Sequence, residues 1–191
     1  MTTDEVIDEF KESGALLEGH FKLSSGLHSS VYLQCALVLQ FPAKAEAFGR
    51  AIAERYAGQQ IELVASPAIG GLIIGHEVAR ALGARFIWTE RQDGEMSLRR
   101  GFTVRAGERA LVVEDVVTTG GSTRETIVAL KKAGTNVIGA ASIIDRSSGE
   151  ADVGVERTAL ATLDVRSLQP HECELCRAGV EVVKPGSRAS K

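Results

Sequence analysis

The sequence predicts an α/β fold, in which a mainly parallel, twisted sheet is flanked by helices. Short apolar runs rich in β-branched residues recur along the chain, and loops of small residues followed by helical spacing separate them. Repeated strand, loop and helix units favour parallel strands, because each connecting helix carries the chain back along the sheet. The chain has 191 residues and is 44% hydrophobic, so it can bury a substantial core, and its length favours one domain over residues 1–191.

Composition and charge exclude several classes of function. A net charge of −3 and a pI near 5.9 argue against non-specific nucleic-acid binding. The longest apolar runs are too short to span a bilayer, so no membrane partner is expected. Three cysteines, an odd number, in a chain without a signal peptide indicate a reducing compartment. We therefore expect a soluble cytoplasmic protein.

The N-terminal elements are expected to be a helix followed by a segment with strand character. Thr2 and Glu5 have the spacing of a capping box and predict an amphipathic helix over residues 3–13. Within residues 19–35 the second half alternates as a strand does, whereas residues 24–30 have loop chemistry. Two interpretations remain open for this segment: a hairpin with a polar turn, or a segment that closes over a ligand.

The middle of the chain contains a second helix and the first strand, loop and helix unit. Pro42 suits the first turn of a helix, and an apolar stripe continues from it until Gly58. The small residues of SPAIGG, 66–71, then separate a strand from a helix. The expected elements are a helix over residues 42–57, a strand over 61–65, a helix over 72–82 and a strand over 84–89.

Residues 90–102, ERQDGEMSLRRGF, show no apolar periodicity. They include Arg91, Arg99 and Arg100, and taken alone this composition predicts a solvated loop. The acidic balance of the whole chain does not argue against a local basic site for an anionic substrate.

The stretch ALVVEDVVTTGGSTR, residues 110–124, carries the clearest functional signal. A buried strand ends in Glu114 and Asp115, hydroxyl residues and glycines follow, and a helix continues over 123–133. Glycines let the backbone approach a ligand, and N–H groups at a helix N-terminus bind phosphate oxygens. Two carboxylates would repel a phosphate, so they are expected to face a ribose diol or a metal held by the substrate. The expected ligand is a sugar phosphate; the alternative is an ordinary turn with two solvated acids.

A further strand is expected over residues 137–144, and it stops at Asp145 and Arg146. A charged pair at the carboxyl end of a strand lies on the edge where α/β sheets bind ligands, although a rim ion pair is the alternative for Arg146. The last strand is expected over 159–168, and residues 186–191 are expected to form a mobile tail.

The motif HECELC contains His171, Cys173 and Cys176. A CxxC pair with a histidine supplies half of a zinc site, or a redox pair. A structural zinc site needs four ligands, and Cys35 is the only other cysteine. We therefore expect a plain turn with reduced thiols and keep metal binding as the alternative.

The stretches quoted above resemble a known family. VVEDVVTTGGSTR is similar to the phosphoribosyl-pyrophosphate (PRPP) signature of type I phosphoribosyltransferases, and it matches neither a P-loop nor the dinucleotide fingerprint. GHFKLSSGLHSSVYLQ, residues 19–34, is similar to the N-terminal segment that covers the pyrimidine in orotate phosphoribosyltransferases. The resemblance covers most of the chain and implies the type I phosphoribosyltransferase fold, with a small N-terminal hood to which residues 1–40 contribute.

The resemblance implies transfer of the phosphoribosyl group of PRPP to orotate, which gives orotidine 5′-monophosphate and pyrophosphate in pyrimidine biosynthesis. Mg²⁺ is the implied cofactor, held mainly through PRPP and not by protein ligands. A homodimer is implied, in which the loop 90–102 acts at the active site of the neighbouring subunit. Ser24 and Gln92 stand where many members have lysine, so the cationic role is expected to pass to the arginines of this loop.

The same resemblance assigns site residues by position. The implied catalytic residues are Glu114, Asp115 and Arg91. The implied PRPP-binding residues are Ser66, Ala68, Ile69, Gly70, Arg91, Glu114, Asp115, Val116, Val117, Thr118, Thr119, Gly120, Gly121, Ser122 and Thr123. The implied orotate-binding residues are Ser25, Gly26, Tyr32, Leu33, Thr118 and Arg146, with Ser29 also near the base.

Two other functions are compatible with the PRPP signature. One is a phosphoribosyltransferase for another base, because only the hood and Arg146 indicate orotate. The other is a non-catalytic regulator that senses PRPP. Such a regulator usually carries an added DNA-binding domain, whereas a single short helix precedes the hood here and the chain is acidic.

Overall fold

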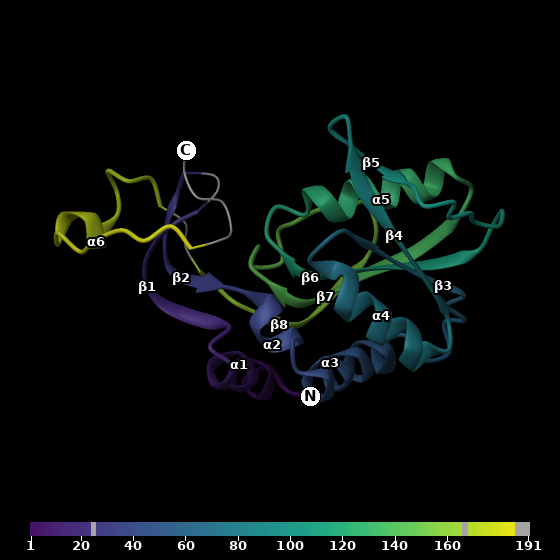
Figure 1. Cartoon of the computed structure of the whole chain (residues 1–191), viewed down its shortest axis with the longest axis horizontal. Helices are drawn as coiled ribbons and strands as arrows, with labels where there is room; N and C mark the ends of the chain where they lie inside the picture. The colour runs from purple at the N-terminus through teal and green to yellow at the C-terminus, as the bar shows by residue number, and fades with distance from the viewer. Residues whose placement is uncertain (24–25, 166–167, 186–191) are drawn as a thin grey trace.

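A computed structural model of the chain describes residues 1–23, 26–165 and 168–185. Its main sheet has six strands in the order β5-β4-β3-β6-β7-β8, all parallel except β5, which pairs antiparallel with β4 (Figure 1). The strands are β3 (Leu63–Pro67), β4 (Arg85–Gln92), β5 (Glu95–Leu98), β6 (Arg109–Val117), β7 (Asn136–Asp145) and β8 (Arg157–Thr162). The predicted α/β fold with a mainly parallel sheet is therefore confirmed.

Helices cover both faces of this sheet. In Figure 1, α3 (Pro42–Arg55) and α4 (Gly71–Leu82) lie below it, and α5 (Gly121–Lys132) lies above it. Along β6 the side chains alternate between two hydrophobic clusters: Leu111 and Val113 pack with α3 and α4, whereas Ala110 and Val112 pack with α5. Because both faces are buried, the strands read as continuous apolar runs in the sequence.

Helix α4 lies unusually close to β3 and to α3. A Cβ atom on Gly75 would lie 2.0 Å from Ser66 Oγ, and one on Gly49 would lie 2.7 Å from Glu77 Cβ. Only glycine permits these approaches, since a larger side chain would push the elements apart. The close packing fixes the N-terminus of α4 against the carboxyl end of the sheet.

The N-terminal part forms a separate two-stranded sheet. The capping box at Thr2 and Glu5 is present and starts α1 (Thr3–Glu12). The antiparallel strands β1 (Leu16–Lys22) and β2 (His28–Leu33) follow, and a short helix that the sequence analysis did not predict, α2 (Cys35–Leu39), leads back to the main sheet. The segment 19–35 is thus a hairpin with its connection in the predicted loop region.

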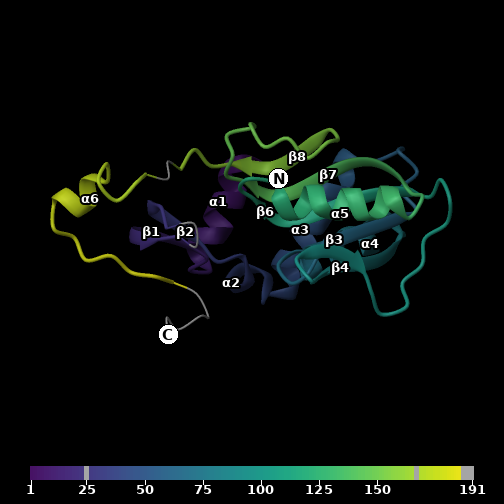
Figure 2. The same ribbon diagram turned by 90° about the horizontal axis from the view of Figure 1, so that it is seen from above.

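The C-terminal segment lies beside this hairpin. Both views place β1, β2 and α6 (Glu174–Arg177) beside the six-stranded sheet and not over it (Figure 2). Residues 168 and 183 join the hairpin through backbone hydrogen bonds: His28 and Leu168 exchange a pair, and Lys22 N–H donates to the Val183 carbonyl at 2.9 Å. We call the hairpin together with residues 168–183 the small lobe. The predicted tail 186–191 lies outside the described residues.

Two sequence-based expectations for strands differ from the structure. The predicted solvated loop 90–102 contains the end of β4, a two-residue turn at Asp93 and Gly94, and β5. An Asp-Gly pair is a strong signal for such a hairpin turn, because both residues adopt positive φ here. The predicted strand 159–168 ends at Thr162 in β8, and the following chain leaves the sheet for the small lobe.

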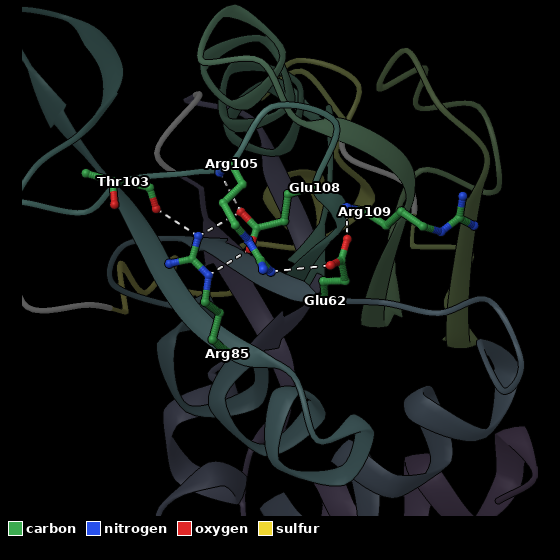
Figure 3. A network of polar contacts seen from close by, with 6 residues as sticks. All are labelled: Glu62, Arg85, Thr103, Arg105, Glu108 and Arg109. Carbon is green, nitrogen blue, oxygen red and sulfur yellow. Dashed lines mark hydrogen bonds and ion pairs between the residues drawn. The ribbon is translucent and has the colours of Figure 1, made fainter.

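A polar network holds the amino ends of three central strands together (Figure 3). The Glu108 side chain is fully buried and accepts two hydrogen bonds from Arg85, at 2.8 and 2.7 Å, and further ones from Arg105. These hydrogen bonds, chiefly those of Arg85, lower the pKa of Glu108 to about 2. Arg105 also forms an ion pair with Glu62, which precedes β3.

The helices of the described residues are all too short or too polar to span a membrane.

Candidate active site

The acid pair lies near the carboxyl end of β6, against the N-terminus of α4. A Cβ on Gly70 would come within 2.8 Å of Asp115 Oδ1, and one on Gly71 within 3.2 Å of Glu114 Oε1. The two glycines of SPAIGG therefore leave space for the carboxyl groups of a strand that is distant in sequence. The structure brings the two predicted loops, 66–71 and 118–123, to the same edge of the sheet.

The surroundings of the two carboxyl groups affect their pKa values differently. Glu114 is only 7% exposed, and burial, reinforced by the charge of Asp115, raises the pKa of Glu114 to about 9. Burial also raises the pKa of Asp115, but its carboxylate accepts hydrogen bonds from the Val116 N–H at 2.8 Å and from the Cys35 thiol. At neutral pH Glu114 is therefore protonated, whereas the hydrogen bonds to Asp115 oppose the rise in its pKa.

The loop after β6 presents hydroxyl groups and a helix N-terminus to solvent. Thr118 and Thr119 are exposed. Gly120 has a φ of +74°, and a Cβ atom at this position would lie only 2.8 Å from Val153 Cγ1, so only glycine fits. Helix α5 starts at the next residue, and no side chain of the described residues caps it. Its first N–H groups are thus available to an anion. Of the other predicted residues here, Ser122 is exposed, whereas Val117 and Thr123 are buried.

A cavity of about 560 Å³ joins this loop to the end of β7. It is lined by Thr118, Thr119, Arg124 and Arg146, among others. The Arg146 Nε atom is buried and has no hydrogen-bond partner among the described residues. Burial lowers the pKa of Arg146. A half-buried guanidinium with an unpaired Nε donor suits a planar carboxylate ligand.

The neighbouring acid, Asp145, does not pair with Arg146. It forms an ion pair with Arg157 at 3.0 Å and accepts hydrogen bonds from Ser147 and from the Gly149 N–H. These bonds order the turn after β7. The alternative that Arg146 belongs to a rim ion pair with its neighbour is therefore wrong.

A second cavity, of about 440 Å³, separates the 66–71 loop from the β4–β5 hairpin. Ala68, Ile69, Arg91 and Arg100 line it, and the peptide bond between Ala68 and Ile69 is cis. The cations at this end are paired within the chain: Arg91 with Glu125 at 2.5 Å and Arg100 with Glu90 at 2.7 Å. Ser66 is fully buried, with its hydroxyl under Gly75 and not in the cavity.

The predicted hood residues are dispersed. Tyr32 is half-buried and packs against Phe21, whereas Leu33 belongs to the core beneath the sheet. Gly26 has a φ of +85°, and the buried Ser29 donates to the Val31 carbonyl. Ser25 lies outside the described residues. A larger groove of about 630 Å³ between β5 and α5 contains none of the predicted site residues.

Three site contacts were missed by the sequence analysis. Cys35 touches Asp115, Glu125 pairs with Arg91, and Glu90 pairs with Arg100. The first two contacts join segments that are distant in the sequence, and the third spans the β4–β5 hairpin, which was not predicted.

Comparisons with known proteins agree with this geometry. Residues 38–161 match the model of the phosphoribosyl transferase domain family. The chain is 53% identical over 188 residues to the orotate phosphoribosyltransferase of Pelotomaculum thermopropionicum, covering 98% of this chain and 99% of that one. It is 50% identical to the enzyme of the same name from Caldicellulosiruptor bescii, with the same coverage. The crystal structure of orotate phosphoribosyltransferase from Aeropyrum pernix superposes with a TM-score of 0.67 at 28% identity, covering 83% of this chain and 93% of that one.

Proposed function

Because this chain belongs to the orotate phosphoribosyltransferase family, we propose that the sheet edge around Asp115, Thr118 and Arg146 binds PRPP and orotate and joins them. The reaction forms a bond from a ring nitrogen of orotate to the anomeric carbon of the ribose and releases pyrophosphate, giving orotidine 5′-monophosphate for pyrimidine biosynthesis. The observation that carries this proposal is the convergence of the acid pair, an uncapped helix N-terminus and a half-buried arginine with an unpaired Nε donor on one edge.

The 5′-phosphate of PRPP is bound by the loop 118–123. N–H groups at the start of α5 and the hydroxyls of Thr118 and Thr119 would surround its oxygens, and the helix dipole favours the negative charge. The cavity beside this loop is large enough for a sugar phosphate. This places the ribose between the loop and the acid pair.

The acid pair binds the ribose hydroxyls and stabilises the transition state. Protonated Glu114 can donate a hydrogen bond and ionised Asp115 can accept one, so the pair matches the donors and acceptors of a diol. Positive charge develops on the sugar as pyrophosphate departs, and the fixed carboxylate of Asp115 lowers its energy. No covalent nucleophile is needed.

Orotate lies at the other end of the same cavity. The Arg146 guanidinium would pair with the carboxylate of orotate. This carboxylate would supply the hydrogen-bond partner that the buried Arg146 Nε atom lacks among the described residues. Tyr32 of the hood would contact the base from the other side. These contacts favour orotate over a base without a carboxylate, and residues 1–40 would supply the cover.

Magnesium fits this site as an ion carried in with the substrate. The donors present are carboxyl and hydroxyl oxygens, which suit Mg²⁺, but burial keeps Glu114 protonated at neutral pH. When bound, Mg²⁺ would offset the charge of the departing pyrophosphate. The protein cations at that end would be Arg91 and Arg100, which would give up their ion pairs with Glu125 and Glu90 and contact the pyrophosphate instead.

We also propose a homodimer in which residues 90–102 serve the neighbouring subunit. The β4–β5 hairpin projects from the sheet edge (Figure 1), and the arginines of residues 90–102 are exposed.

The three cysteines form no disulfide, which supports a reducing, cytoplasmic location.

One assay tests the assignment of the base. The purified chain is incubated with Mg-PRPP and each of orotate, uracil, hypoxanthine and adenine, while orotate absorbance and released pyrophosphate are followed. Turnover with orotate alone is expected. Turnover only with another base would retain the PRPP site and contradict the role of Arg146, and PRPP binding without any turnover would favour the regulator.

A further inference from the structure

The small lobe buries polar side chains where a hydrophobic core is expected. His20 and His28 are 3% and 6% exposed, while Val180, Val182 and Val183 of the same lobe are between 41% and 53% exposed. A two-stranded hairpin is marginally stable by itself, and small structures of this kind usually depend on a disulfide or a metal. Something other than apolar packing must hold the C-terminal segment to the hairpin.

Four candidate metal ligands meet at this point. His20, His28, Cys173 and Cys176 each offer one ligand atom, and all four atoms lie within 4.8 Å of one another. His20 Nε2 is 2.8 Å from His28 Nδ1 and 3.4 Å from Cys173 Sγ, and Cys176 Sγ is 3.1 Å from His28 Nδ1. A tetrahedral zinc ion with two nitrogen and two sulfur ligands separates its ligand atoms by about 3.3–3.8 Å. Small adjustments would therefore accommodate the ion.

The local backbone conformation directs these four side chains toward one another. The β1–β2 register shifts between Glu18 and Phe21, so His20 lies in a β-bulge and is buried together with its neighbour Phe21. Bulges commonly redirect a side chain in this way. Cys173 precedes the single turn of α6, which brings Cys176 to the same side.

A second contact fixes the tautomer of one histidine. His20 Nδ1 lies 2.8 Å from the Val180 carbonyl, which can only accept, so Nδ1 carries the proton in the neutral ring. Nε2 then presents its lone pair to the cluster. A histidine that binds a metal through one ring nitrogen usually donates the other ring N–H to a group such as a backbone carbonyl.

We propose that His20, His28, Cys173 and Cys176 bind a structural zinc ion that fastens the C-terminal segment to the hood. Two thiolates and two imidazoles suit zinc, and four protein ligands leave no open position for catalysis. From the sequence, His171 was the expected histidine of such a site, but its side chain is 78% exposed and lies outside the cluster. The histidine ligands are 153 and 148 residues from the cysteines they touch, so no local spacing reveals them.

The first test measures zinc in the intact chain. The protein is produced without a histidine tag, dialysed, and analysed for metals by mass spectrometry. We expect about one zinc ion per chain for the wild type. Cys173→Ser and Cys176→Ser are expected to lose it, whereas the matched control His171→Ala, which alters the same motif outside the cluster, should keep it. Equal loss in the control would overturn the proposal.

A second test does not depend on the folding of the variants. The wild-type chain is loaded with Co²⁺ in place of zinc under reducing conditions, and its absorption spectrum is recorded. Thiolate-to-cobalt charge-transfer bands and the strong visible bands of tetrahedral cobalt are expected. Absence of bound zinc and of this spectrum, or a Cys173–Cys176 disulfide in protein alkylated at lysis, would show that the cluster is not a metal site.

Discussion

At the scale of single residues, Glu114 and Asp115 are neighbours whose carboxyl groups act differently. Both are withdrawn from water, yet Asp115 accepts a backbone N–H and the Cys35 thiol, and these donors stabilise its charge. At Glu114 burial dominates and raises its pKa to about 9. The fold therefore keeps Glu114 neutral before the substrate arrives and gives Asp115 the donors that a carboxylate needs, which sets up hydrogen bonds of opposite direction to a diol.

This asymmetry predicts a pH-dependent effect of Glu114→Gln on stability. The pKa of Glu114 is about 9 in the folded chain against 4.5 for an unperturbed glutamate. Between these values the unfolded chain has released a proton that the folded chain keeps, so stability falls as the pH rises. Glutamine cannot ionise, so the variant should exceed the wild type by about 1 kcal/mol or more at pH 8 and match it near pH 4. Urea unfolding at both pH values measures this, and an equal difference at both would contradict it.

Arg146→Gln is predicted to weaken orotate binding selectively. A charge-assisted hydrogen bond to a carboxylate contributes about 1.5–3 kcal/mol, so the KM for orotate should rise about tenfold to a hundredfold. The KM for PRPP should change much less. Arg124→Gln, on the same cavity at the first turn of α5, is the matched control and should leave the orotate KM unchanged. A parallel rise in both KM values for Arg146→Gln would argue against its role at the base.

Single residues also show what the sequence could and could not predict. The acids and the hydroxyl loop were identified because they are contiguous within residues 110–124. Cys35 lies eighty positions before the carboxylate it touches, and its contact depends on the hood folding back to the sheet. The histidines beside Cys173 and Cys176 were missed for the same reason.

At the scale of whole elements, prediction succeeded where local chemistry and the fold agree. The strand and helix around residues 110–133 were predicted because burial on both faces produces an uninterrupted apolar run. The hairpin at Asp93 and Gly94 was missed because its strands lie at the sheet edge, where burial is incomplete and leaves no apolar period. Helix α2 has only five residues, too few for a periodic signal.

The amino ends of the strands depend on the Glu108 network, and this predicts a second pH effect of opposite sign. The pKa of Glu108 is about 2, below the unperturbed 4.5, so its ion pairs stabilise the fold above pH 4.5 and are lost as the pH falls through about 2. Glu108→Gln should cost on the order of 2 kcal/mol at pH 7, and the difference from the wild type should shrink below pH 4.5.

Two comparisons separate this effect from general destabilisation. Glu62→Gln removes a 45% exposed partner in the same network and should cost much less. The kcat of both variants should stay close to that of the wild type at 25 °C, because the network lies at the amino ends of the strands, whereas the acid pair lies near the carboxyl end of β6. A large fall in kcat for folded Glu108→Gln would contradict the view that this network is purely structural.

At the scale of the whole molecule, the proposed homodimer predicts complementation between two inactive variants. Asp115→Asn removes the transition-state carboxylate and should lower turnover about a hundredfold or more without unfolding the chain. Arg91→Ala removes the cation at the pyrophosphate end and should also lower turnover. If residues 90–102 serve the neighbouring subunit, a heterodimer of the two variants contains one site with both an intact Asp115 and an intact Arg91.

The heterodimer can be isolated by co-expressing the two variants with different affinity tags. It should regain about half of the wild-type activity, because one of its two sites is complete. If the hairpin instead acts within its own chain, each site lacks one group, and the heterodimer should be as inactive as its parents. The ion pair between Arg91 and Glu125 of the same chain makes this comparison informative, since Arg91 must leave it to reach either active site. Glu125→Gln in the Arg91-bearing subunit should therefore preserve complementation, whereas loss of Arg91 in both subunits should abolish it.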